Sequence, residues 1–238
     1  MKSRAGERIR GQDERAPETP GGTTSGGTGA DPLAIGILAI QGDFDAHSQA
    51  LQRVGAAFRL VRKEQELCGL AGLILPGGES TTLLKVLAEE NLFEPIRQFA
   101  QAHPVFGTCA GAILMADEVE NPAQESLRLM RMRVRRNAYG RQLASSIQTV
   151  EASPSLDDGP ESGTPLEAVL IRAPVIVEVG AEVEVLARLE GRPVLVRQGL
   201  YLAGTFHPEL TPDARVHRYF CRMARQGAGL EGTPVGGL

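Results

Sequence analysis

The sequence contains only three cysteines, Cys68, Cys109 and Cys221, in 238 residues. They are widely spaced, odd in number and without a Cys-x-x-Cys pair, so they indicate neither a disulfide framework nor a zinc knuckle. Such cysteine usage is typical of a reducing compartment. We therefore predict a cytoplasmic protein.

The chain has no excess of positive charge and no long apolar run. The formal net charge is −4, whereas a nucleic-acid groove or a polybasic membrane anchor needs a concentrated positive field. No apolar run is long enough to span a bilayer, and residues 1–32 contain none that resembles the core of a signal peptide. The sequence therefore predicts no nucleic-acid partner and no membrane partner, and favours small molecules or proteins as ligands.

Composition divides the chain into three parts. Residues 1–31 are rich in glycine, threonine, proline and charged residues, so burial cannot offset the entropy of ordering them. We predict a disordered extension there and a flexible tail over residues 227–238. The length suits one well-buried domain, which we place at residues 32–226.

Within the domain, apolar strands alternate with amphipathic helices. Strands are expected within residues 33–40, 58–61, 70–75 and 104–108, and helices within residues 45–55, 80–92 and 110–119. This alternation indicates a parallel sheet covered on both faces. Further strands between residues 134 and 206 predict antiparallel additions, before a last helix that Thr211 caps and Pro212 begins. We expect a three-layer α/β fold with a mostly parallel central sheet.

Cys109 lies in a Gly-x-Cys-x-Gly stretch between Gly107 and Gly111, which is the spacing of a nucleophile elbow. In such an elbow a strand turns sharply into a helix, and the strained turn leaves room only for small neighbours. The N–H of Ala110 would then point at the reacting carbonyl, and the helix dipole would favour the thiolate. The alternative is a buried structural cysteine at a strand-to-helix junction.

A nucleophilic cysteine needs a base, and the chain has four histidines. Three of them are interpreted as surface or packing residues: His47, His103 and His217. His207 differs, because it ends an apolar strand and is followed two residues later by Glu209. Positions i and i+2 of an extended segment share a face, so Glu209 is placed to orient His207. With the elbow, this predicts a Cys109–His207–Glu209 triad.

Two glycines, Gly77 and Gly78, follow a buried strand and lead into Glu79 and a helix start at Ser80. They allow close backbone approach, so the N–H of Gly78 is predicted to be a second oxyanion donor beside that of Ala110. A phosphate-binding loop is the competing interpretation. It is disfavoured because neither a following Gly-Lys-Ser/Thr nor a Gly-x-Gly-x-x-Gly is present.

Six stretches carry a resemblance to a known family: IGILAIQGDFDAH from Ile35, GLILPGGESTTL from Gly72, FGTCAGAILMA from Phe106, RRNAYGRQ from Arg135, LIRAP from Leu170 and GTFHPELTPDARVHRYF from Gly204. The chain resembles the class I, or triad, glutamine amidotransferases. Within that family it is most similar to the glutaminase subunits of pyridoxal 5′-phosphate synthase.

The resemblance implies the roles of particular residues. Cys109 would be the nucleophile, His207 the general base and acid, and Glu209 its orienter. The glutamine pocket would be lined by Gly78, Glu79, Ser80, Arg136, Ile171 and Arg172. A guanidinium suits the substrate's α-carboxylate because it is a forked, permanently charged donor. Which arginine makes that contact stays open.

The resemblance also implies partners. L-Glutamine would be the substrate, and ammonia would pass to a synthase subunit in a large hetero-oligomer, with no cofactor and no metal in this chain. Gln41 would lie toward that subunit. We expect an incomplete oxyanion hole in the free chain, because the peptide between Gly77 and Gly78 can flip.

Other functions stay open at this point. A triad glutaminase could serve another acceptor, such as the imidazole glycerol phosphate pathway. The elbow could belong to a cysteine peptidase or another cysteine hydrolase. A non-enzymatic interaction module, with Cys109 merely buried, is the remaining alternative.

Overall fold

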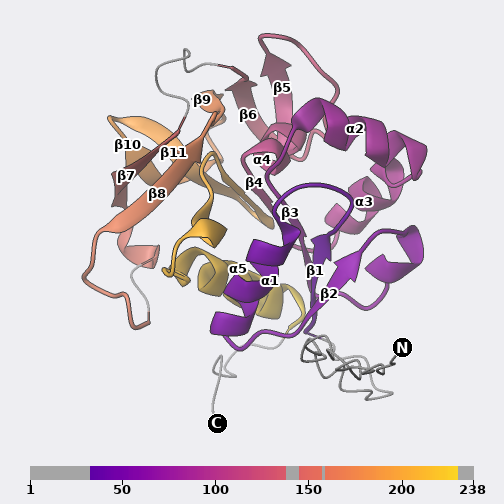
Figure 1. Cartoon of the computed structure of the whole chain (residues 1–238), viewed down its shortest axis with the longest axis horizontal. Coiled ribbons are helices and arrows are strands. Elements are labelled where there is room, and N and C mark those ends of the chain that lie inside the picture. The colour runs from indigo at the N-terminus through magenta and orange to yellow at the C-terminus, as the bar shows by residue number, and fades with distance from the viewer. Residues whose placement is uncertain (1–32, 138–144, 157–158, 230–238) are drawn as a thin grey trace, which may run out of the picture.

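The computed structural model describes residues 33–137, 145–156 and 159–229 (Figure 1). The predicted extension over residues 1–31 lies outside the described residues, as does most of the predicted tail. Among the described residues, no helix is long and apolar enough to cross a bilayer.

A nine-stranded sheet forms the centre of the molecule, in the order β2-β1-β3-β4-β12-β11-β10-β7-β8. The first five of these strands pair in parallel: β2 (Phe58–Val61), β1 (Ile35–Leu38), β3 (Gly72–Leu75), β4 (Val105–Thr108) and β12 (Tyr201–Gly204). The other four continue the sheet in antiparallel pairs: β11 (Arg192–Gln198), β10 (Glu184–Leu189), β7 (Ser145–Ala152) and β8 (Leu166–Ile171).

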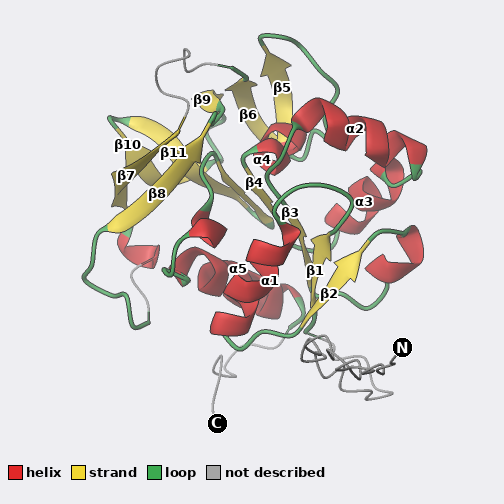
Figure 2. Ribbon diagram, in the orientation of Figure 1, coloured by secondary structure: helices red, strands yellow, loops and turns green. Residues whose placement is uncertain are grey.

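Helices cover both faces of the parallel part (Figure 2). They are α1 (Phe44–Arg53), α2 (Ser80–Glu89), α3 (Phe93–Ala100), α4 (Ala110–Met115) and α5 (Arg215–Gly227), with short 3-10 turns at η1 (Glu64–Leu67), η3 (Pro154–Leu156) and η4 (Pro208–Leu210). Two apolar clusters, one on each face of the sheet, pack the helices against it. Leu38 of β1 packs in the cluster with α2, α3 and α4, whereas Ile37 packs in the cluster with α1 and α5. Successive strand residues thus face opposite helix layers, which confirms the predicted three-layer α/β fold.

A second sheet was not predicted. It has three strands, β5 (Ala116–Glu120), β6 (Met130–Arg135) and β9 (Val175–Val179), in that order. The expected helix over residues 110–119 was therefore wrong in its second half, because α4 ends at Met115. Ala116 and Val119 are buried while Asp117 and Glu118 are exposed, and these residues pair with β6 instead of continuing the helix.

The last helix also begins later than predicted. α5 starts at Arg215, after Ala214, and not at Pro212. The hydroxyl of Thr211 donates to the carbonyl of Pro208 in η4, so it does not cap α5. Asp213 accepts a hydrogen bond from the N–H of Arg215 in its place.

Close packing of backbone explains why the turn after β4 needs glycine. A Cβ on Gly111 would lie 2.0 Å from the carbonyl oxygen of Leu75, and a Cβ on Gly107 would lie 2.6 Å from the carbonyl carbon of Gly111. We expect Gly111→Ala to destabilise the fold by about 3 kcal/mol, because the clash is with backbone that cannot move away. Urea unfolding followed by circular dichroism measures this cost.

Gly191→Ala is the matched control. Gly191 has a positive φ of 75° but nothing within 4 Å of an added Cβ, so its replacement should cost only about 1 kcal/mol through backbone strain. Equal losses in the two variants would contradict a steric role for Gly111.

Candidate active site

The carboxyl ends of the parallel strands converge on one edge of the sheet. Cys109 follows β4, Gly77 follows β3 closely, and His207 follows β12. A Cβ placed on Gly77 would lie 2.4 Å from Cε1 of His207 and 3.3 Å from Cβ of Cys109. The three segments therefore meet at the edge where open α/β sheets bind ligands.

Cys109 occupies the strand-to-helix turn between β4 and α4. Its backbone has φ 49° and ψ −104°, a conformation that is rare for a residue other than glycine. The neighbouring strand holds this conformation, because the N–H of Cys109 donates to the carbonyl of Gly204 at 2.8 Å. The residue is 7% exposed. This is the arrangement expected of an elbow that presents a side chain above a sheet.

His207 and Glu209 form a buried pair. The Nδ1 of His207 donates to Oε1 of Glu209 at 2.8 Å, and the Glu209 side chain is fully buried. The N–H of His207 donates to the carbonyl of Val169 in β8, which fixes the backbone where η4 begins. Burial raises the pKa of Glu209, and the hydrogen bond and charge of His207 oppose that rise.

The thiol of Cys109 lies at the same pocket as His207. Burial lowers the pKa of His207, but hydrogen bonds with Cys109 and Glu209 outweigh it and raise this pKa to about 10. Since Nδ1 is held by Glu209, Nε2 is the ring nitrogen left to face the thiol. Cys109 and His207 line the same pocket, and Glu209 holds the imidazole from behind; the role of the three residues as a triad stays a prediction.

A second carboxylate, Asp43, was missed by the sequence analysis. Its Oδ2 lies 3.6 Å from Nδ1 of His207, and its side chain is 46% exposed. The available signal was its position just after β1, at the same edge of the sheet as Cys109. Asp43, His207 and Glu209 each offer one atom within 4.8 Å of the others, as metal ligands do. A metal at Nδ1 would displace the hydrogen bond to Glu209, so we assign none.

A pocket of about 230 Å³ opens beside Cys109. It is lined by Asp43, Gly78, Glu79, Ser80, Cys109, Ile113, Arg136, Asn137, Ile171, Arg172, Pro174 and His207. The six residues predicted to line the glutamine pocket therefore lie around one cavity. Four lining residues were not predicted: Asp43, Ile113, Asn137 and Pro174. A larger hollow of about 800 Å³ lies by α3 and residues 117–129 and includes none of the triad.

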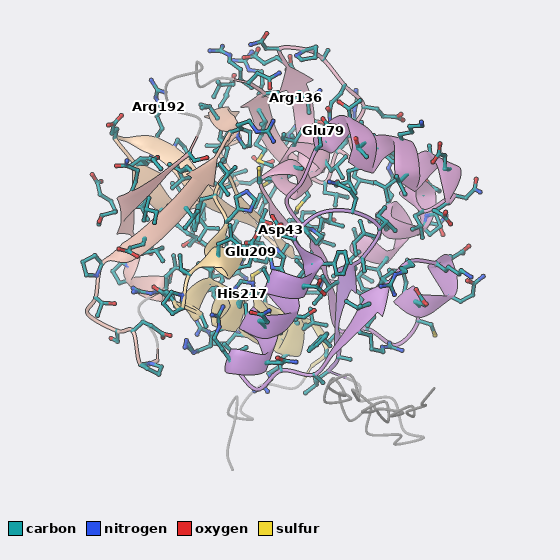
Figure 3. The ribbon with its side chains drawn as sticks, in the orientation of Figure 1. Asp43, Glu79, Arg136, Arg192, Glu209 and His217 are labelled. Carbon is teal, nitrogen blue, oxygen red and sulfur yellow. The ribbon has the colours of Figure 1, made fainter. Side chains whose placement is uncertain are left out.

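Glu79 and Arg136 lie side by side at this pocket (Figure 3). Glu79 caps α2, accepting from the N–H groups of Thr81 and Thr82. The hydroxyl of Thr82 also donates to Glu79 and has the largest effect. Together these hydrogen bonds lower the pKa of Glu79 to about 2. Arg136 donates to the hydroxyl of Thr81 at 3.0 Å and lies 3.7 Å from Glu79. The guanidinium is therefore held at the pocket wall with its charge partly balanced.

Two backbone amides were predicted to form an oxyanion hole. Ala110 is 1% exposed and begins α4. The carbonyl of Gly77 accepts from the N–H of Asp43 at 3.3 Å. Because the C=O and N–H of a trans peptide point in opposite directions, the N–H of Gly78 points away from the amide of Asp43. The roles of Gly78 and Ala110 stay predictions.

Known proteins resemble this chain over most of its length. The model of the SNO glutamine amidotransferase family matches residues 37–226. The chain belongs to this family.

Similar proteins carry the name pyridoxal 5′-phosphate synthase subunit PdxT. The one from Koribacter versatilis is 55% identical over 195 residues, covering 82% of this chain and 97% of its own length. The one from Solibacter usitatus is 54% identical over 186 residues, covering 78% of this chain and 96% of its own. A crystal structure of a glutamine amidotransferase, 46% identical, has a TM-score of 0.73 and covers 80% of this chain and 98% of that one.

Solved structures at lower identity show the fold alone. The glutaminase domain of CTPS from Trypanosoma brucei is 12% identical, with a TM-score of 0.57, and covers 85% of this chain and 96% of that one. Membership of the family makes this chain a glutamine amidotransferase, an enzyme that takes ammonia from glutamine. This confirms the activity that the resemblance predicted.

Proposed function

We propose that the chain is the glutaminase subunit of a pyridoxal 5′-phosphate synthase and that Cys109, His207 and Glu209 carry out its reaction. The observation that supports this assignment is that Cys109 and the buried His207–Glu209 pair meet at one pocket. An isolated buried cysteine needs no such base and no such cavity.

The reaction has two halves. The Cys109 thiolate attacks the side-chain amide carbon of glutamine, and the carbonyl oxygen becomes an oxyanion held by the N–H groups of Ala110 and Gly78. Protonated His207 gives its proton to the amide nitrogen, the C–N bond breaks, and ammonia leaves a glutamyl thioester. His207 then takes a proton from water, the hydroxide attacks the thioester carbon, and cleavage of the C–S bond releases glutamate. No step requires a cofactor or a metal.

The pocket supplies recognition of the substrate. We propose that Gly78, Glu79, Ser80 and Ile171 line the glutamine site and that Arg136 or Arg172 binds the α-carboxylate. Ser80 is already oriented, because its hydroxyl donates to Oε1 of Gln124 at 3.1 Å.

Arg136→Gln tests the choice between the two arginines. If Arg136 binds the α-carboxylate, KM for glutamine should rise about 10- to 100-fold with a smaller change in kcat, because a hydrogen bond to a charged group is lost. Steady-state glutamate release measures both constants. Arg135→Gln is the matched control, since Arg135 is half exposed and pairs with Glu120 outside the pocket. An unchanged KM in Arg136→Gln would assign the carboxylate to Arg172.

The names of the relatives point to the partner. They are called subunits of pyridoxal 5′-phosphate synthase, and ammonia is useful to a synthase only if it is delivered before it is protonated in water. We propose that this chain docks on a synthase subunit in a large hetero-oligomer, with Gln41 facing it, and that docking completes the oxyanion hole. Two adjacent glycines allow the peptide between Gly77 and Gly78 to rotate. A cytoplasmic location stays a prediction.

Glutamate release from glutamine, measured for the full chain alone and with the synthase subunit of the same organism, tests this function. Strong stimulation by the synthase subunit, absent in Cys109→Ala, is the expected result. Full activity alone without stimulation would leave a glutaminase but remove the assigned partner. If no glutamate is released with or without the synthase subunit, the proposed function is wrong and the hydrolase and interaction-module alternatives are favoured.

A further inference from the structure

Two histidines that the reaction above does not use lie behind Glu209. His47 in α1 and His217 in α5 are both 0% exposed. Nδ1 of His47 lies 2.9 Å from Nε2 of His217. Nε2 of His47 lies 3.1 Å from Oγ1 of Thr108 and 3.5 Å from Oε1 of Glu209. That same carboxylate oxygen accepts a hydrogen bond from His207. A continuous row of polar side chains therefore links α5 and α1 to the triad.

Burial disfavours the charged form of both imidazoles. Burial, followed by repulsion from the protonated forms of His217 and His207, holds the pKa of His47 well below its usual range. Burial and the charge of Arg53 lower the pKa of His217 to about 3. The ring of Phe106 packs edge-on against both, with centroids 6.2 Å and 5.9 Å away. Each imidazole therefore carries a single N–H, and its position is decided by its neighbours.

The groups around His217 and His47 decide which ring nitrogen of each carries the proton. Nδ1 of His217 is buried and has no hydrogen-bond partner among the described residues. A proton there would be a buried, unpaired donor, so it resides on Nε2 and is donated to Nδ1 of His47. His47 must then carry its own proton on Nε2, which points at Thr108 and at Glu209.

We propose that His47 is a positioning residue of the catalytic triad: its Nε2–H, oriented by His217, holds the carboxylate of Glu209 ionised and in the geometry that orients His207. This inference rests on the function proposed for Cys109, His207 and Glu209. It assigns a role in the reaction to a pair of side chains that would otherwise only fill space between two helices.

Glu209 has a physical need for such a donor. Its side chain is fully buried, and Oε2 has no hydrogen-bond partner among the described residues. The charge of Asp43 adds to the effect of burial in disfavouring the ionised form, and His207 and a backbone hydrogen bond at Glu209 oppose both. A buried carboxylate that keeps its charge needs several N–H or O–H donors. His47 places an N–H 3.5 Å from Oε1 of Glu209, beside Oγ1 of Thr108 at 3.1 Å, without adding a charge.

A pair of amide substitutions separates this role from packing. In His47→Gln the amide nitrogen reaches the place of Nε2 and keeps a donor for Glu209. In His47→Asn the shorter side chain reaches only the place of Nδ1 and keeps a partner for His217. Both lose the ring, so a structural role would affect them alike.

The full chain with its synthase subunit is assayed for glutamate release, and the pH dependence of Cys109 alkylation by iodoacetamide is measured in parallel. We expect His47→Asn to lower kcat about tenfold with KM for glutamine within twofold, and to move the alkylation midpoint to higher pH, because a weaker Glu209–His207 pair supports the thiolate less. His47→Gln should restore most of both. Equal kcat and equal alkylation profiles in the two variants would overturn the proposal, whereas an inactive wild type would instead contradict the proposed function.

A measurement on the unmodified chain covers the case in which neither variant folds. Nitrogen-15 NMR of the histidine side chains should show His47 and His217 neutral, with both protons on Nε2, from pH 6 to pH 8. A proton on Nδ1 of His47 would leave His47 with no donor facing Glu209 and would overturn the proposal.

Discussion

Replacing Cys109 with alanine should lower glutaminase turnover by about 10⁴-fold or more, because no other group in the pocket can form the thioester. The fold should survive. Alanine at φ 49° meets the same backbone strain as cysteine does, and only a sulfur is removed. Glutamate release in the presence of the synthase subunit measures the loss, and circular dichroism confirms folding.

Cys221→Ala is the matched control. Cys221 is 3% exposed in α5, and burial raises the pKa of its thiol to about 12, so it is not a nucleophile at neutral pH. Its variant should keep full turnover. If Cys109→Ala kept the wild-type rate, the residue would be structural and the triad assignment would fail.

The meeting of Cys109 and the His207–Glu209 pair at one pocket was predictable because its signals are local. Gly107 and Gly111 flank Cys109 because backbone atoms pack where a Cβ would sit, and this constraint is visible as Gly-x-Cys-x-Gly. His207 and Glu209 are two residues apart, which suggested their pairing, but the extended geometry assumed for it was wrong, because Glu209 lies in the 3-10 turn η4. The parallel strands were equally visible as continuous apolar runs.

The parts that were missed depend on contacts between distant segments. The hydrogen bond between His47 and His217 joins residues 170 positions apart, and neither neighbourhood in the sequence shows that the other exists. The second sheet is similar: Ala116 leaves the helix because Met130 is there to pair with it. The local sequence of residues 116–119 favours a helix, but pairing with a distant strand makes them a strand.

Glu209→Gln should lower kcat by about 10³- to 10⁴-fold, as removal of the carboxylate from a triad does elsewhere. Glutamine has nearly the same shape, but it has no charge to stabilise the imidazolium of His207. The variant Asp43→Asn gives the contrast, because Asp43 lies 3.6 Å from the same nitrogen but is half exposed, and its charge is screened by solvent. We expect Asp43→Asn to change kcat less than fivefold. Equal losses in the two variants would mean that His207 depends on both carboxylates.

Glu209→Gln should also change how the free energy of unfolding depends on pH. The pKa of His207 is raised to about 10 in the folded chain, whereas an unfolded histidine has a pKa of about 6.5. Between these values the folded state holds a proton that the unfolded state has lost, so this stabilisation is complete below about pH 6.5 and is lost as pH rises toward 10. In Glu209→Gln the pKa of His207 falls, and the free energy of unfolding should depend less on pH across this range. Urea unfolding at pH 6, 8 and 10 measures it, and identical slopes in the two proteins would show that Glu209 does not set the protonation of His207.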